Sequence, residues 1–185
     1  AQWLGKNCSR ETELLRNMRF GIIGSGAIGA YYSARLAQGD EGVHFLFHSD
    51  YDYVRQHGLT INSTAGDFHI DNVQAYYSAD DMPKCGVVIV ALKSTNQHLL
   101  KSLLPPLLKE DTWVLLIQNG IGLEEDFVCD FPHTTVLAGL AFICNTKTKP
   151  GVVDHTDLRR LNIGDYNSET SAKPHIDSEI INITH

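Results

Sequence analysis

Apolar runs of strand length alternate along the chain with amphipathic stretches of helical period. The runs predict strands at 20–23, 43–47, 87–91, 113–117 and 136–144, with 73–76 as a shorter extended piece. Helical patterns lie between them, at 27–38, 97–104 and 123–129. This alternation predicts an α/β fold of the Rossmann type, in which a doubly wound, mostly parallel sheet carries helices on both faces.

Two further patterns depart from the alternation. Residues 59–62 and 67–70 flank the turn Thr64-Ala65-Gly66 and predict a small hairpin. Residues 151–155 and 161–164 predict two antiparallel strands near the C-terminal end of the sheet. The composition then shifts to Asn, Ser, Thr and Lys without an amphipathic repeat, so we expect a loosely ordered tail. The predicted division is therefore an extension over 1–17, a Rossmann domain over 18–165 and a tail over 166–185.

Composition narrows the classes of function. The chain has 185 residues and a formal net charge of −7, with no basic run, which argues against a nucleic-acid or membrane-surface partner. The apolar runs are far shorter than a membrane span, and the N-terminus has no apolar signal-peptide core, so a cytoplasmic protein is expected. The histidines and the four scattered cysteines lack the spacing of a metal site. Nothing in the sequence fixes an oligomeric state.

A glycine-rich turn follows the first strand and opens the first helix. Its residues, taken together as candidate ligands, are Gly24, Ser25, Gly26, Ala27, Ile28 and Gly29. In a strand–turn–helix context this G-x-G-x-x-G spacing is typical of dinucleotide binding. Gly24 permits the tight turn, Gly26 lets a pyrophosphate approach the backbone, and Gly29 lets the helix pack closely on the strand. The helix N-terminus would add unpaired N–H groups and a positive dipole end.

The end of the second strand carries the residues that choose between cofactors. An acidic side chain at this point binds the adenosine ribose diol, whereas a cation or hydroxyl accepts a 2′-phosphate. His48 and Ser49 come first and favour NADP(H). Asp50 follows them, and it has two possible roles: it can reach the ribose, or it can cap the short helix that begins after it. The second role is the one we expect.

Two more polar residues directly follow predicted strands. Lys93 comes after strand 87–91 and Asn119 after strand 113–117. Ligands bind at the carboxyl ends of parallel strands, so both are candidates for cofactor contact. The simpler alternatives are a solvated surface lysine and an asparagine that supports the turn before Gly120. We expect a ligand role for both residues.

These segments, taken in order, resemble one family. The resemblance covers 18–165 and rests on the glycine turn, Phe47-His48-Ser49-Asp50-Tyr51, Ala91-Leu92-Lys93, Gln118-Asn119-Gly120-Ile121-Gly122, 151–155 and 161–164. The family is that of ketopantoate reductase (2-dehydropantoate 2-reductase). The resemblance implies a Rossmann domain followed by an all-helical C-terminal domain, with the active site between them. It also implies NADPH as cofactor and the reduction of ketopantoate, a small 2-oxo acid, in pantothenate synthesis.

The resemblance also assigns individual roles. It implies that the three turn glycines hold the cofactor phosphates, that Lys93 helps to hold NADPH, and that Asn119 lies near the nicotinamide and the substrate. His48 stands where the family usually has an arginine for the 2′-phosphate. A histidine side chain is only partly charged at neutral pH, so a weaker preference for NADP is expected here.

No residue of this chain is assigned as catalytic. The resemblance implies that the general-acid lysine and the residues that bind ketopantoate belong to the C-terminal domain, which would follow His185. A positioned acid contributes about 10²–10⁴-fold to such a reaction. Three functions remain open. The first is the NADP(H)-binding domain of a reductase of ketopantoate or a similar 2-oxo acid, and the second is a non-catalytic NADP(H)-binding module or truncated, inactive copy. The third is another member of the wider hydroxyacid dehydrogenase group with a different substrate.

Overall fold

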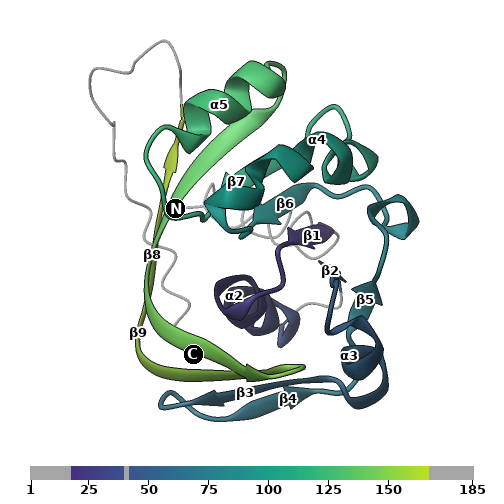
Figure 1. Ribbon diagram of the computed structural model, residues 1–185, viewed down its shortest axis with the longest axis vertical. Coiled ribbons are helices and arrows are strands. Elements are labelled where there is room, and N and C mark those ends of the chain that lie inside the picture. The colour runs from purple at the N-terminus through teal and green to yellow at the C-terminus, as the bar shows by residue number, and fades with distance from the viewer. Residues whose placement is uncertain (1–17, 40–41, 167–185) are drawn as a thin grey trace, which may run out of the picture.

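The computed structural model describes residues 18–39 and 42–166, and these residues form one nine-stranded sheet with helices on both faces (Figure 1). The predicted extension 1–17 and nearly all of the predicted tail lie outside the described residues. The strands are β1 (Phe20–Ile23), β2 (Val43–Leu46), β3 (Leu59–Ser63), β4 (Phe68–Ile70), β5 (Gln74–Tyr76), β6 (Val87–Val90), β7 (Trp113–Leu116), β8 (Thr135–Lys149) and β9 (Val152–Asp165). The helices are α2 (Ala27–Ala37), α3 (Tyr51–His57), α4 (Leu100–Leu103) and α5 (Leu123–Asp130), with 3₁₀ turns η1 (Ala79–Asp81), η2 (Ser94–Leu99) and η3 (Pro105–Leu107).

Six strands form the parallel part of the sheet, in the order β5-β2-β1-β6-β7-β8. This is the 3-2-1-4-5-6 order of a dinucleotide-binding fold, which confirms the predicted fold class. In the register of this sheet Ile23, the last residue of β1, lies beside Leu46 of β2 and Val90 of β6. The carboxyl ends of the central strands therefore meet at one edge.

The remaining strands curve away from the parallel part. The predicted pair of strands at 151–155 and 161–164 is wrong, because residues 152–165 form one continuous strand, β9, antiparallel to β8. The long β8 offers a pairing partner along this whole length, and register shifts near Cys144 and a left-handed Leu158 absorb the bend. The predicted hairpin is confirmed as β3 and β4, and β3 joins the sheet parallel to β9.

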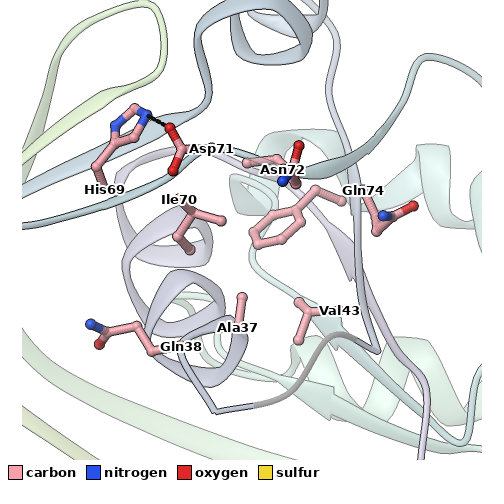
Figure 2. A pocket seen from close by; sticks show the side chains of 10 residues that line it. Ala37, Gln38, Val43, His69, Ile70, Asp71, Asn72 and Gln74 are labelled. Atoms are coloured by element: carbon pink, nitrogen blue, oxygen red, sulfur yellow. Dashed lines mark ion pairs between the residues drawn. The ribbon is translucent and has the colours of Figure 1, made fainter.

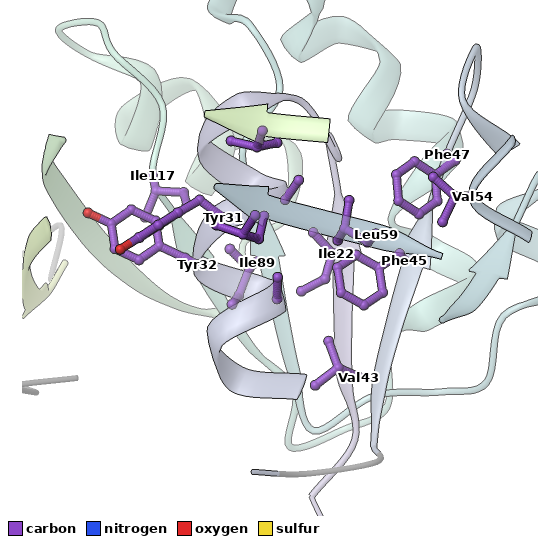
Figure 3. Packing of buried hydrophobic residues seen from close by; sticks show 14 of the residues in the cluster. Ile22, Tyr31, Tyr32, Val43, Phe45, Phe47, Val54, Leu59, Ile89 and Ile117 are labelled. Carbon is purple, nitrogen blue, oxygen red and sulfur yellow. The ribbon is translucent and has the colours of Figure 1, made fainter. Parts of the chain in front are cut away.

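Helix α2 lies inside the curve of this sheet (Figure 1). An ordinary surface helix buries one stripe, but six successive residues of α2, from Gly29 to Ala34, are buried. Tyr31 and Tyr32 pack among side chains of the surrounding strands (Figure 3). The Tyr32 hydroxyl donates to the Arg160 carbonyl of β9 at 3.2 Å, and burial together with the neighbouring Tyr31 raises the pKa of Tyr32 to about 12. The glycine turn is thus attached to an enclosed helix.

The other face of the sheet is covered by α4, η3 and α5. Leu100, Leu107 and Phe127 bury their side chains there against the strands. The predicted helix over 97–104 is partly wrong, because the helical segment starts earlier and its first part is a 3₁₀ turn. Helical structure begins directly after Lys93 as the 3₁₀ turn η2, in which the Asn96 amide donates to the Lys93 carbonyl at 2.8 Å. It becomes α-helical only from Leu100 and ends before two prolines.

Candidate functional site

Each predicted site segment follows the carboxyl end of a parallel strand. The glycine turn follows β1, and His48 and Ser49 follow β2. Lys93 comes after β6, and Asn119 after β7. Because these four strands are neighbours, the sheet brings all the predicted residues to one edge, around the point where the strand order reverses.

The glycine turn is packed tightly at two of its three glycines. Gly24 has φ of +98°, and a Cβ there would lie 2.5 Å from the Leu92 amide nitrogen. A Cβ on Gly29 would lie 2.3 Å from the Gly24 carbonyl oxygen and 3.0 Å from the Ala91 Cβ. Both positions therefore need glycine, for conformation or for space.

The turn is open at its middle glycine. A Cβ on Gly26 would meet no atom within 4 Å, although the residue sits at the N-cap of α2. The first hydrogen bond of the helix runs from the Ala30 amide to the Gly26 carbonyl. Within the described part of the chain, the amides of Ala27, Ile28 and Gly29 have no acceptor. Three N–H groups and the positive end of the helix dipole therefore border an open space, which suits an anion.

Two side chains hold this turn from the outside. The Ser25 hydroxyl donates to the Leu46 carbonyl at the end of β2, at 2.9 Å. The Asn145 amide group of β8 donates to the Ala27 carbonyl at 2.9 Å. Ser25 was predicted as a ligand, and in the structure its side chain ties the turn to β2. The sequence gives no signal for Asn145, which is 118 residues from its partner.

Asp50 occupies the N-cap position of α3, but its side chain does not cap the helix, and that expectation is wrong. The residue is 4% exposed, and its carboxylate is shared among three donors. Oδ1 accepts from the Ser49 hydroxyl at 2.9 Å and from the Lys147 ammonium at 3.0 Å. Oδ2 accepts from the Gly151 amide at 3.2 Å. The carboxylate thus accepts from Ser49 and from two residues of the β8–β9 hairpin instead of from the first amides of α3.

These partners set the charge state of Asp50. Burial alone would raise the pKa of this carboxyl, but the hydrogen bonds from Lys147, Gly151 and Ser49 outweigh it, and the pKa is lowered. Asp50 is therefore ionised at neutral pH, and its charge is balanced by Lys147, whose side chain is 35% exposed. Sequence reasoning missed Lys147, because 97 residues separate the two partners.

At the other end of the edge, two glutamines fix the loops that carry Lys93 and Asn119. The Gln118 amide group donates to the Leu92 carbonyl at 3.0 Å, and that of Gln97 donates to the Leu123 carbonyl at 2.8 Å. Both glutamines have a buried Oε1 without a hydrogen-bond partner among the described residues. The side chains of Lys93 and Asn119 are exposed. This end of the edge thus carries two exposed polar side chains on loops that the glutamines hold in place.

A separate cavity of about 530 Å³ lies at the opposite edge of the sheet (Figure 2). Val43 and Gln74, the first residues of β2 and β5, line it together with the end of α2. His69 and Asp71 form an ion pair of 3.6 Å at its rim (Figure 2). The cavity therefore does not include any predicted site residue. In the described ranges no helix is long and apolar enough to cross a membrane, and no group of three potential metal ligands occurs.

Comparison with known proteins gives a consistent picture. The family model described as ketopantoate reductase PanE/ApbA matches residues 20–168. A 2-dehydropantoate 2-reductase from Nostoc sp. is 43% identical over 152 residues, which is 82% of this chain and 48% of the relative. The crystal structure of 2-dehydropantoate 2-reductase from Geobacter metallireducens superposes with a TM-score of 0.77 and 34% identity, covering 80% of this chain and 50% of that one.

A more distant structure shares the fold. It is the ternary structure of D-mandelate dehydrogenase with NADH and anilino(oxo)acetate, with a TM-score of 0.72 at 21% identity over 82% of this chain and 49% of that chain. The chain spans about half the length of the curated relatives that it matches.

Proposed function

The chain belongs to the ketopantoate reductase PanE/ApbA family, and we propose that it binds NADP(H) along the carboxyl edge of its parallel strands. The observation that carries this proposal is the open space above Gly26, bordered by the amides of Ala27, Ile28 and Gly29. A Cβ at Gly26 would meet no atom within 4 Å, so the space beside this residue is open to a pyrophosphate. Hydrogen bonds to a charged group contribute about 1.5–3 kcal/mol each, so three such donors favour an anion strongly.

The far end of the edge fits the nicotinamide half of the cofactor. When bound, this group would supply a hydride. The Gln118 amide group donates to the Leu92 carbonyl and so ties the loop after β7 to the loop after β6. The exposed Lys93 and Asn119 follow β6 and β7 beside it. We assign Lys93 to the negatively charged cofactor and Asn119 to the nicotinamide and the substrate.

The surroundings of Asp50 favour the phosphorylated cofactor. A free carboxylate after β2 would bind the ribose diol of NAD(H) and repel a 2′-phosphate. Here both carboxylate oxygens accept hydrogen bonds within the chain, and Lys147 balances the charge. The side chains of His48 and Ser49 are exposed at the same strand end and remain accessible to a phosphate.

For the whole enzyme of the relatives' length, we propose reduction of a small 2-oxo acid such as ketopantoate. The curated relative from Nostoc sp. carries the name of that activity. The alternative is a non-catalytic NADP(H)-binding module, and the residues described here support cofactor binding more directly than they support turnover.

Titration of the 185-residue chain with NADPH and with NADH, monitored through the fluorescence of the cofactor, tests the proposal. We expect both to bind, with NADPH the tighter ligand. A turnover assay with ketopantoate then separates the reductase from the binding module, since binding without turnover supports the module. If neither cofactor binds, the proposed function is wrong.

A further inference from the structure

Three aromatic rings gather beside the end of β2, on the side away from β1. Tyr77 follows β5, and its ring lies 6.1 Å from that of His48 at an interplanar angle of 22°. Tyr51, the first residue of α3, lies 5.7 Å from Tyr77. Tyr77 is 62% exposed, so most of its side chain is open to solvent although two other rings lie beside it.

The backbone and a cation hold the cluster in place. The Phe47 amide donates to the Tyr76 carbonyl at 2.9 Å, which keeps the residues that follow, His48 and Tyr77, side by side. Arg55 donates to the Tyr51 hydroxyl at 2.9 Å. The Tyr77 hydroxyl has no hydrogen-bond partner within the described ranges. The Tyr77 ring is therefore positioned by its neighbours without being buried.

The proposed direction of the cofactor brings its adenosine to this cluster. The pyrophosphate lies at the turn after β1, and the nicotinamide extends toward β6 and β7. The adenosine must then extend the opposite way, across the end of β2 toward β5. Neighbouring strands are about 4.8 Å apart, so a ribose at the end of β2 leaves its base near the boundary between β2 and β5, where Tyr77 lies.

We propose that the ring of Tyr77, supported by His48 and Tyr51, is the stacking platform for the adenine base of the cofactor. This inference rests on the proposed function. Base–aromatic stacking is independent of the ribose 2′-substituent, so Tyr77 acts equally on NADPH and NADH. It thus supplies affinity for the adenine nucleotide, whereas the choice between the two cofactors lies with the groups around Asp50.

A single exposed tyrosine is common on protein surfaces, and the chain contains a matched control. Tyr53 is 40% exposed and stacks on His57 at 4.5 Å with the same interplanar angle of 22°. It is two residues from Tyr51 on α3, so it faces another side of the helix, toward Gly151. It therefore has the same chemistry as Tyr77 but not its place beside β5.

The experiment measures dissociation constants of the full chain and its variants by calorimetry. The ligands are NADPH, NADH, adenosine 2′,5′-bisphosphate and reduced nicotinamide mononucleotide, which lacks adenine. We expect Tyr77→Ala to weaken the first three by about 5- to 150-fold, the range that corresponds to a stacked base. Binding of the mononucleotide, the ratio of NADPH to NADH affinity and the melting temperature should not change. Tyr77→Phe, which keeps the ring, and the control Tyr53→Ala should both bind all four ligands with the dissociation constants of the wild type.

The outcomes separate this inference from the proposed function. If the wild-type chain binds NADPH and Tyr77→Ala binds it equally well, the stacking platform is wrong and cofactor binding stands. The same conclusion follows if Tyr77→Ala weakens the mononucleotide as much as the adenine ligands, or if Tyr53→Ala has the same effect. If the wild-type chain binds none of the four ligands, both proposals fail.

Discussion

Replacing Gly29 with alanine tests whether the glycine turn is held by close packing of the helix on the strands. The added methyl group would lie 2.3 Å from the Gly24 carbonyl oxygen and 3.0 Å from the Ala91 Cβ. Neither neighbour is the end of a flexible side chain. The carbonyl belongs to the turn itself, and the Ala91 methyl group is attached directly to the backbone that follows β6. Relief of the overlap therefore requires the backbone to shift.

The magnitude follows from two opposing effects. Overpacking of this kind costs about 1–3 kcal/mol, and exchanging glycine for alanine within a helix returns up to about 1 kcal/mol. Because the closest contact is to backbone, we expect Gly29→Ala to lower the free energy of unfolding by about 1–2 kcal/mol. For a domain of this size that corresponds to a fall in Tm of about 2–8 °C.

Gly26→Ala is the matched control for this substitution. Its methyl group would meet no atom within 4 Å, and its φ of −80° suits any residue. The loss of an N-cap glycine should cost less than about 1 kcal/mol. The methyl group would, however, stand in the space proposed for the pyrophosphate, so we expect NADPH affinity to fall at least about tenfold, or ~1.4 kcal/mol.

Urea denaturation and cofactor titration of both variants complete the test. Gly29→Ala should lose stability, and Gly26→Ala should lose binding with little loss of stability. If Gly29→Ala is as stable as the wild type, close packing does not explain the glycine. If Gly26→Ala binds NADPH as tightly as the wild type, the turn does not hold the cofactor phosphates.

Two further predictions concern buried groups. Because the pKa of Asp50 is lowered in the fold, its ionised form stabilises the protein at pH values above the ordinary pKa of 3.8, and this contribution is lost as the pH falls through the lowered pKa. Asp50→Asn should therefore lower the free energy of unfolding, measured by chemical denaturation at pH 7, by about 1–3 kcal/mol. Equal stability of the variant and the wild type at pH 7 would contradict the pairing with Lys147. Burial raises the pKa of the Cys85 thiol to about 11, whereas Cys129 and Cys144 are exposed. Peptide mapping after iodoacetamide treatment at pH 8 should therefore find Cys129 and Cys144 modified and Cys85 protected until the protein unfolds. Equal rates of modification at these three cysteines would contradict the prediction.

In the candidate site, the residues whose positions in the fold were predictable are those placed by short, local sequence patterns. Gly24, Gly26 and Gly29 lie within one turn, and their spacing after an apolar run specifies both the conformation and the strand edge. Lys93 and Asn119 each follow a buried strand, so the parallel register of the sheet brings them to the same edge as the glycine turn. A short pattern is sufficient wherever the determining contacts are local.

The parts that were missed depend on contacts between distant segments. The sequence beside Asp50 suggests a helix cap, because nothing there shows that Lys147 and Gly151 arrive from the far end of a curved hairpin. The single long β9 was likewise predicted as two strands, since its continuity is imposed by its partner β8. Tyr77 follows an extended piece without a motif, and only the pairing of β5 with β2 brings it beside His48.

The curved hairpin also bears on how an acidic chain would hold the proposed anionic cofactor. The formal net charge is −7, but surface charges farther away than about 8 Å are largely screened at physiological ionic strength. Binding is therefore decided by nearby groups, and a bare carboxylate after β2 would oppose a phosphate there. Lys147 of β8 cancels that charge, while Asn145, two residues earlier on the same face of β8, holds the start of α2. The β8–β9 hairpin thus removes the repulsion between Asp50 and a phosphate and also holds the N-terminal turn of α2, whose amides are the proposed donors. A site whose donors are already in place loses less conformational entropy on binding.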